Sequence, residues 1–133
     1  MDLAEVPGEK VSILPCLLEV HSQDIQAKRF DELVKGQQVY LNPECDLSSM
    51  AKSMDMTGAK LSKSIKTYYG LAFAEFINRL RIQYFLDQRS NFSQHTMETY
   101  IYQSGFSNRS TFYAAFKKYV GVNPSFYLKE LNA

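Results

Sequence analysis

The sequence predicts an all-α fold, with two copies of one short helical motif joined by a long helix. Three observations predict it. Apolar residues recur at helical spacing in one segment after another. The segments begin at Ser, Thr, Asn or Asp and stop at Gly or Pro, the residues that start and end helices. One arrangement of these features occurs twice, about fifty residues apart along the chain.

Composition limits the possible functions. The 133 residues, 45% of them hydrophobic, can build the core of one domain or of two small lobes. No run of about 20 apolar residues occurs, so no membrane contact is expected. The segment 12–18 lacks the basic region and cleavage site of a signal peptide. Cys16 and Cys45 form no disulfide framework, and a reduced, cytoplasmic setting fits best.

The residue types that catalysis requires do not occur in a recognisable arrangement. There is no Ser/His/Asp or Cys/His constellation, no glycine loop for a phosphate and no metal-binding spacing. The sequence therefore predicts a protein that is not an enzyme and that needs no cofactor and no metal.

The charges are unevenly distributed. Residues 1–46 carry four basic and nine acidic side chains, a formal charge of −5, and residues 47–133 carry eleven and five, a charge of +6. A basic module thus follows an acidic leader. Such asymmetry is typical of chains that bind nucleic acid or another anionic surface.

Residues 1–23 have no sustained period and are interpreted as an acidic leader or linker remnant. Loose packing is expected for them, although the apolar patch within residues 11–18 leaves docking on the domain or on a partner open. A helical pattern begins at Asp24. Its expected inner face consists of Ile25, Phe30, Leu33 and Val34.

The first copy of the motif covers about 47–69. Asp46 or Ser48 is expected to cap a two-turn helix. Asp55 stands where a left-handed turn residue is needed, and Thr57 caps a second helix that Gly70 stops. The inner side of this second helix is expected to carry Leu61, Ile65 and one of Tyr68 and Tyr69. Its outer side carries Ala59, Lys60, Ser62, Lys63 and Lys66.

A longer helix is expected over about 72–89. It has two apolar stripes on different sides, so it should be buried on both and link two lobes. The second copy of the motif covers about 96–120. Thr96 caps its first helix, Gly105 allows a sharp turn, and Asn108 or Ser110 caps its second helix. Gly121 ends that helix, and Pro124 starts the last one.

The two copies align at an offset of fifty residues in the first helix and fifty-one in the second. A tight turn into an amphipathic helix with a basic outer face is typical of a DNA-binding helix-turn-helix unit. Two such units on a rigid linker helix could enter successive major grooves about 34 Å apart.

The chain resembles the DNA-binding domain of the AraC/XylS family of bacterial transcription regulators over 24–131. The resemblance rests on LSSMAKSMDMTGAKLSKSIKTYYG, on INRLRI in the linker and on GFSNRSTFYAAFKKYVGVNPSFY. It implies seven helices in two homeodomain-like helix-turn-helix lobes. It also implies sequence-specific binding of double-stranded DNA, with RNA polymerase and, through a missing sensor region, a second copy of the chain as further partners.

The resemblance also implies which residues contact DNA. Arg109 would recognise guanine O6 and N7, and Tyr113 or Ala59 would contact a thymine methyl group. The implied base contacts are Ala59, Ser62, Lys63, Arg109, Ser110, Tyr113 and Ala114. The implied phosphate contacts are Thr57, Lys60, Lys66, Thr96, Asn108 and Lys117.

The sequence departs from the family where Ile101 replaces a usual alanine, which Ala51 retains in the first copy. We expect Ile101 to widen the second motif. An alternative function stays open: the chain could be a protein-interaction module, or the output module of a larger sensory regulator that binds DNA only when a missing region pairs two copies.

Overall fold

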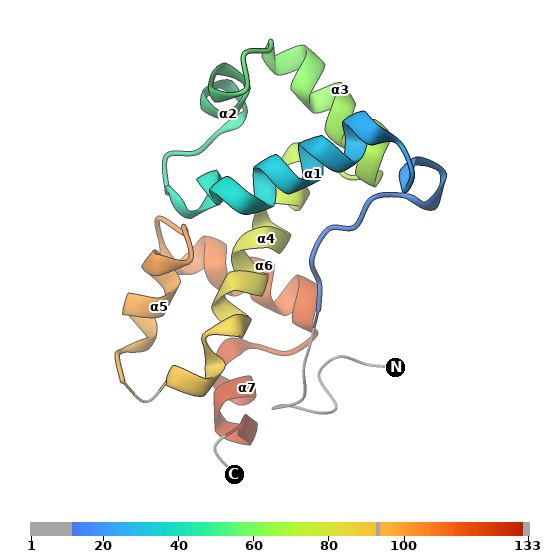
Figure 1. Ribbon diagram of the computed structural model, residues 1–133. Coiled ribbons are helices and arrows are strands. Elements are labelled where there is room, and N and C mark those ends of the chain that lie inside the picture. The colour runs from blue at the N-terminus through green and yellow to red at the C-terminus, as the bar shows by residue number, and fades with distance from the viewer. Residues whose placement is uncertain (1–11, 93, 132–133) are drawn as a thin grey trace. The chain divides into compact units, whose positions relative to one another are not determined.

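The computed structural model describes residues 12–92 and 94–131. Within these ranges it contains seven α-helices and no strand, which confirms the predicted all-α class (Figure 1). Short 3₁₀ turns at Glu19–His21, Val39–Leu41 and Arg89–Asn91 separate some of the helices. The chain divides into two compact units. The N-terminal unit is residues 15–77, and the C-terminal unit is residues 12–14 together with 78–131.

The N-terminal unit contains α1 (Ile25–Gln37), α2 (Leu47–Ser53), α3 (Gly58–Tyr69) and the first turn of α4 (Phe73–Asp87). Local chemistry starts each of the first three helices. The Asp24 side chain accepts hydrogen bonds from the backbone of α1, and Asp46 forms a reciprocal capping box with Ser49 at α2. Its buried core includes Ala27, Val34, Met50, Ala51, Leu61, Ile65, Tyr69, Phe76 and Ile77.

The prediction for the inner face of α1 is wrong in part. The side chains of Ile25 and Leu33 are 74% and 40% exposed, whereas Ala27 and Val34 are buried. Apolar residues on this helix occur on more than one side, so periodicity alone left the buried face ambiguous. The buried face is the one that carries Phe30, whose ring lies 6.5 Å from that of Phe76.

A polar network joins the middle of α1 to the C-terminal end of α3. The Tyr69 hydroxyl donates to Asp31 Oδ1 at 2.6 Å, and Lys35 Nζ lies 2.9 Å from the same carboxylate. Lys35 Nζ also donates to the Pro15 carbonyl at 2.8 Å. Burial, followed by the hydrogen bond to Asp31, raises the pKa of the Tyr69 phenol above its ordinary value. The phenol is therefore held neutral as a hydrogen-bond donor.

The C-terminal unit contains the rest of α4, then α5 (Met97–Gln103), α6 (Arg109–Val120) and α7 (Pro124–Leu131). Its core is aromatic. The Phe85 ring lies 4.7 Å from Phe112 and 5.8 Å from Phe116, and Phe116 lies 5.5 Å from Tyr127. These packed rings set which face of α6 is covered, and hence which face is left for contact with other molecules.

The expected leader includes residues 1–11, which lie outside the described residues. Ile13 is buried in the core of the C-terminal unit. Its N–H donates to Gln83 Oε1 at 2.7 Å, and its carbonyl accepts from Arg79 Nε at 2.9 Å. At this position the segment packs on the domain, which was one of the outcomes that the sequence left open.

The internal repeat has the same form in three dimensions. The helices α2 and α5 each have 7 residues, and α3 and α6 each have 12. Thr57 caps α3 as Asn108 caps α6, and left-handed Gly70 and Gly121 follow the two helices. Both motifs are therefore complete helix-turn-helix units, within 47–69 and 96–120.

Candidate nucleic-acid interface

The first motif turns sharply between α2 and α3. Asp55 adopts a φ of 57°, the left-handed conformation predicted for it, and Met56 N–H donates to the Ala51 carbonyl at 2.9 Å. The Thr57 hydroxyl oxygen then accepts from Lys60 N–H at 3.1 Å. These bonds satisfy backbone groups at the turn, so the start of α3 has a fixed direction.

The helix α3 has one covered and one open face. Leu61 and Ile65 are fully buried, as predicted. Ser62 is half-buried. The other residues predicted to contact DNA from this motif are all exposed: Thr57, Ala59, Lys60, Lys63 and Lys66. The structure therefore presents three lysines along an otherwise small and polar surface, which suits close approach to a polyanion.

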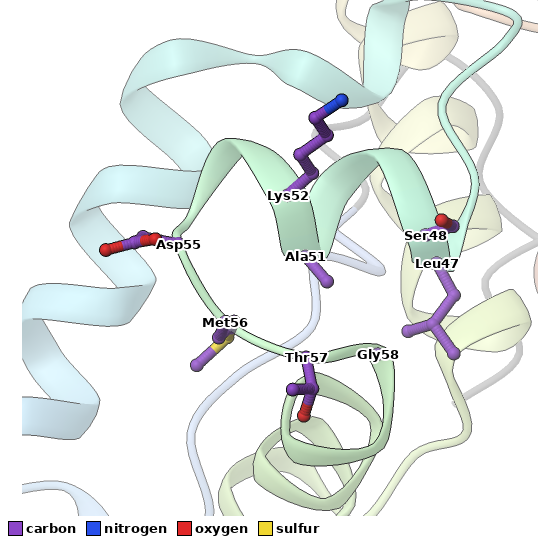
Figure 2. A pocket seen from close by; sticks show the side chains of 8 residues that line it. All are labelled: Leu47, Ser48, Ala51, Lys52, Asp55, Met56, Thr57 and Gly58. Atoms are coloured by element: carbon purple, nitrogen blue, oxygen red, sulfur yellow. The ribbon is translucent and has the colours of Figure 1, made fainter.

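An open groove of about 690 Å³ lies between α2, the turn and the start of α3 (Figure 2). Leu47 and Ala51 point from α2 toward the segment that holds Thr57 and Gly58, while Lys52 points the other way. Because Ala51 is small and 98% of its surface is covered, α3 can come close to α2 at this point.

The second motif has the same order of helix, tight turn and capped helix as the first, with different side chains. Gly105 has a φ of 97°, where a side chain would be strained, and the Asn108 side chain accepts from Thr111 N–H at 2.8 Å. Of the two caps that the sequence allowed, Asn108 is the one used. Phe112 and Phe116 are fully buried, and Tyr119 is half-buried.

Ile101 fills the position of Ala51 in the second motif and is 0% exposed. The backbones of α2 and α3 come close along more of their length than those of α5 and α6. The turn of the second motif is also one residue longer, so the expectation that Ile101 itself widens this motif stays a prediction.

The remaining predicted contacts lie on the outer face of α6 and at the N-termini of α5 and α6. Arg109, Ser110, Ala114 and Lys117 are exposed, and Tyr113 is half-buried. Thr96 and Asn108 are exposed at the N-termini of α5 and α6, where their side-chain oxygens already accept backbone N–H groups. The Thr96 hydroxyl also lies 3.0 Å from the Thr99 hydroxyl. The positive end of each helix and the amide hydrogens of Asn108 are the groups there that could face a phosphate.

Arg109 is held in place by its neighbours. Its Nη1 donates to Glu98 Oε1 at 3.2 Å, and its Nη2 donates to the Tyr113 hydroxyl at 2.9 Å. The guanidinium carbon lies 5.3 Å from the centre of the Tyr113 ring. The Tyr113 hydroxyl in turn lies 3.5 Å from Met97 Sδ. The hydrogen bond with Tyr113 is the largest cause that raises the pKa of the Arg109 guanidinium above its ordinary value, and the charge of Glu98 adds to it.

Glu98 is the residue of this site that sequence reasoning missed. It lies in the first turn of α5, where an acidic side chain has an ordinary role beside the positive helix end. Nothing in the sequence paired it with a residue eleven positions later. The turn of the second motif brings the two together.

No group of His, Cys, Asp or Glu side chains in the described part of the chain is arranged to hold a metal ion. No helix within residues 12–92 and 94–131 is long and apolar enough to cross a bilayer.

Comparison with known proteins gives one family and several similar solved structures. A family model described as "Helix-turn-helix domain" matches residues 50–130. The structure is similar to the C-terminal domain of AraT, a response regulator from Geobacillus stearothermophilus, at 20% identity, with a TM-score of 0.68 and coverage of 82% of this chain and 88% of that one. No curated protein matches the sequence.

Two further solved structures are similar. The C-terminal domain of the two-component response regulator yesN from Fusobacterium nucleatum is 21% identical, with a TM-score of 0.66 and coverage of 77% of this chain and 98% of that one. ToxT from Vibrio cholerae is 26% identical, with a TM-score of 0.63, and the match covers 84% of this chain but 40% of ToxT. The likeness to the two response-regulator domains is one of fold.

Proposed function

The chain belongs to the AraC-type helix-turn-helix family of DNA-binding transcription regulators, and from that premise we propose that it binds double-stranded DNA sequence-specifically by inserting α3 and α6 into successive major grooves. The observation that carries this proposal is the repeat itself: two helices of equal length, each entered through a tight turn, each covered on one side only. A major groove about 12 Å wide admits one α-helix.

The proposed base contacts lie on the open faces of these helices. Arg109 can donate to both guanine O6 and N7, because a guanidinium has several N–H donors in one plane. Lys63 can donate to guanine from α3. Ala59 and Ala114 are small enough for a thymine methyl group to approach, and the remaining contacts are Ser62, Ser110 and Tyr113.

The proposed phosphate contacts are of two kinds. Lys60, Lys66 and Lys117 are exposed cations that would each neutralise one phosphate. Thr57, Thr96 and Asn108 stand at helix N-termini, where backbone N–H groups favour an anion. Three neutralised phosphates give a log–log dependence of affinity on salt with a slope of about −2.7.

We propose further that the chain acts as the output module of a larger cytoplasmic regulator. The solved domains of AraT and yesN, which have the same fold, are C-terminal domains of response regulators. In the described part of this chain, Val20 and Ile25 are 81% and 74% exposed, so apolar side chains are available to a further region or to a second copy. RNA polymerase is a further proposed partner at the promoter.

Selection of bound fragments from random duplex DNA at two salt concentrations tests the proposal. We expect an asymmetric motif with two elements about one helical turn, about 34 Å, apart. Arg109→Ala should degrade one element and Lys63→Ala the other, because each variant removes the donor for one base. Lys129→Ala, which removes an exposed cation of α7, is the matched control and should leave both elements intact.

The outcomes separate the alternatives. A motif that only Arg109→Ala degrades would make the first motif a phosphate clamp rather than a base reader. Enrichment only when two copies are joined through an added dimerisation domain would favour the paired output module. No enrichment in either form, at either salt concentration, would reject the DNA-binding proposal in favour of a protein partner.

A further inference from the structure

The second motif contains a charged cluster that the first motif lacks. By the repeat alignment, Glu98, Arg109 and Tyr113 correspond to Ser48, Gly58 and Ser62 of the first motif. The helices of the first motif have the same lengths and the same kind of caps without any such cluster. At the place where Glu98 and Arg109 join α5 to α6, the first motif has the open groove of Figure 2. The helix-turn-helix unit therefore does not need these residues in order to fold.

The cluster limits the directions in which Arg109 can point. Arginine has one of the largest losses of rotamer entropy when a side chain is ordered. Here an ion pair at Nη1, a hydrogen bond at Nη2 and the face of the Tyr113 ring act on one guanidinium. The Tyr113 hydroxyl in turn contacts Met97 Sδ, which helps to position the Tyr113 side chain. Arg109 is thus ordered before any ligand binds, although its side chain and that of Glu98 are 53% and 54% exposed.

An arginine can contact DNA in two ways, by hydrogen bonds to base edges and by electrostatic attraction to phosphates. The cluster affects these two contacts differently. A guanidinium has five N–H donors, and the two hydrogen bonds leave three of them for base acceptors. The carboxylate of Glu98 meanwhile offsets the positive charge that would attract any phosphate, whatever the sequence. The side chain keeps its directional donors and loses much of its non-directional attraction.

We propose that Glu98 is a positioning residue that fixes Arg109 for base recognition and suppresses its binding to phosphates, so that it sets the sequence specificity of the second motif. This proposal rests on the proposed function, because it assumes that Arg109 contacts a base. Glu98 would remain paired with Arg109 in the specific complex and would touch no base itself.

The test uses the full chain, a duplex of the selected sequence, a duplex in which the guanine assigned to Arg109 is replaced by adenine, and random duplex DNA. Affinities are measured by fluorescence anisotropy over a series of salt concentrations. For Glu98→Gln we expect the preference for guanine over adenine to fall about two- to fivefold, the size of an exposed ion pair. The salt slope on random duplex should steepen by about 0.9, since Arg109 becomes free to neutralise one more phosphate.

Three further variants make the test specific. Glu130→Gln removes the same charge from α7 and should leave the guanine preference unchanged. Glu98→Asp keeps the charge but shortens the side chain by one methylene group. The salt slope on random duplex should therefore stay as in the original chain, while the preference for guanine falls. In an Arg109→Ala background, Glu98→Gln should change neither quantity, because its effect passes through Arg109.

A guanine preference that survives Glu98→Gln but is lost in Arg109→Ala would overturn the role of Glu98 and leave the proposed function intact. An effect of Glu98→Gln that persists without Arg109 would also overturn it. If Arg109→Ala itself leaves the preference for guanine unchanged, the base contact assigned under the proposed function fails, and the role of Glu98 fails with it.

Discussion

Replacing Ile101 by alanine should destabilise the C-terminal unit, although alanine is the equivalent residue of the first motif. The Ile101 side chain is completely buried in the core beside α6. The substitution removes three buried carbons, worth about 0.8 kcal/mol each, or about 2.4 kcal/mol in transfer free energy. A cavity adds to this cost, so we expect a loss of about 3 to 4 kcal/mol in the free energy of unfolding, within the range of about 2 to 5 kcal/mol known for such truncations.

The reciprocal change gives the matched control. Ala51 is the equivalent residue of the first motif, where the backbones of α2 and α3 lie close together. Ala51→Ile inserts three carbons into that contact and should cost about 1 to 3 kcal/mol through overpacking. Each helix pair is thus fitted to its own residue, and the same exchange is expected to be unfavourable in both directions.

The assay is urea unfolding followed by circular dichroism and by tyrosine fluorescence, because the chain contains no tryptophan. Two compact units can unfold in separate steps, so hydrogen exchange at the amides of α6 and α3 assigns each loss to a unit. An Ile101→Ala variant as stable as the original chain would contradict this prediction, since it would mean that α5 and α6 close over the vacated space without cost.

Two further predictions concern stability. Tyr69→Phe should cost about 0.5 to 1.5 kcal/mol at pH 8 through the lost hydrogen bond to Asp31. Because the folded state raises the pKa of Tyr69 above its ordinary value of 10.0, that stabilisation is complete below pH 10 and is lost as the pH rises further, when only the unfolded chain releases the proton. The difference in urea midpoint between the original chain and Tyr69→Phe should therefore be smaller at pH 11 than at pH 8. An equal difference at both pH values would contradict the proposed role of the Tyr69 hydroxyl. Asn108→Ala should cost about 1 kcal/mol by removing the cap of α6, measured by thermal unfolding, whereas Asn108→Asp should keep the cap; equal losses in both variants would show that capping is not the cause.

The caps and stops of the helices could be predicted because they depend on near neighbours. Thr57 and Thr96 accept from backbone N–H groups three residues ahead, and Gly70 and Gly121 take the left-handed conformation that glycine adopts without steric cost. The open faces of α3 and α6 followed from helical period for the same reason. The predicted DNA contacts lie on those faces or at the N-caps of α3, α5 and α6, and their contacts with DNA stay predictions.

The all-α class, the repeat, the turns and the outward faces of α3 and α6 could thus be predicted from the sequence. All of them depend on residues that lie within one or two helical turns of each other. Tertiary structure decided which side of α1 is covered, why Ile13 bonds to Gln83 seventy residues away, and that Glu98 meets Arg109 across a turn. Packing and ion pairing at these places depend on residues that are distant in the chain, and no local pattern records which of several apolar or charged partners will be brought together.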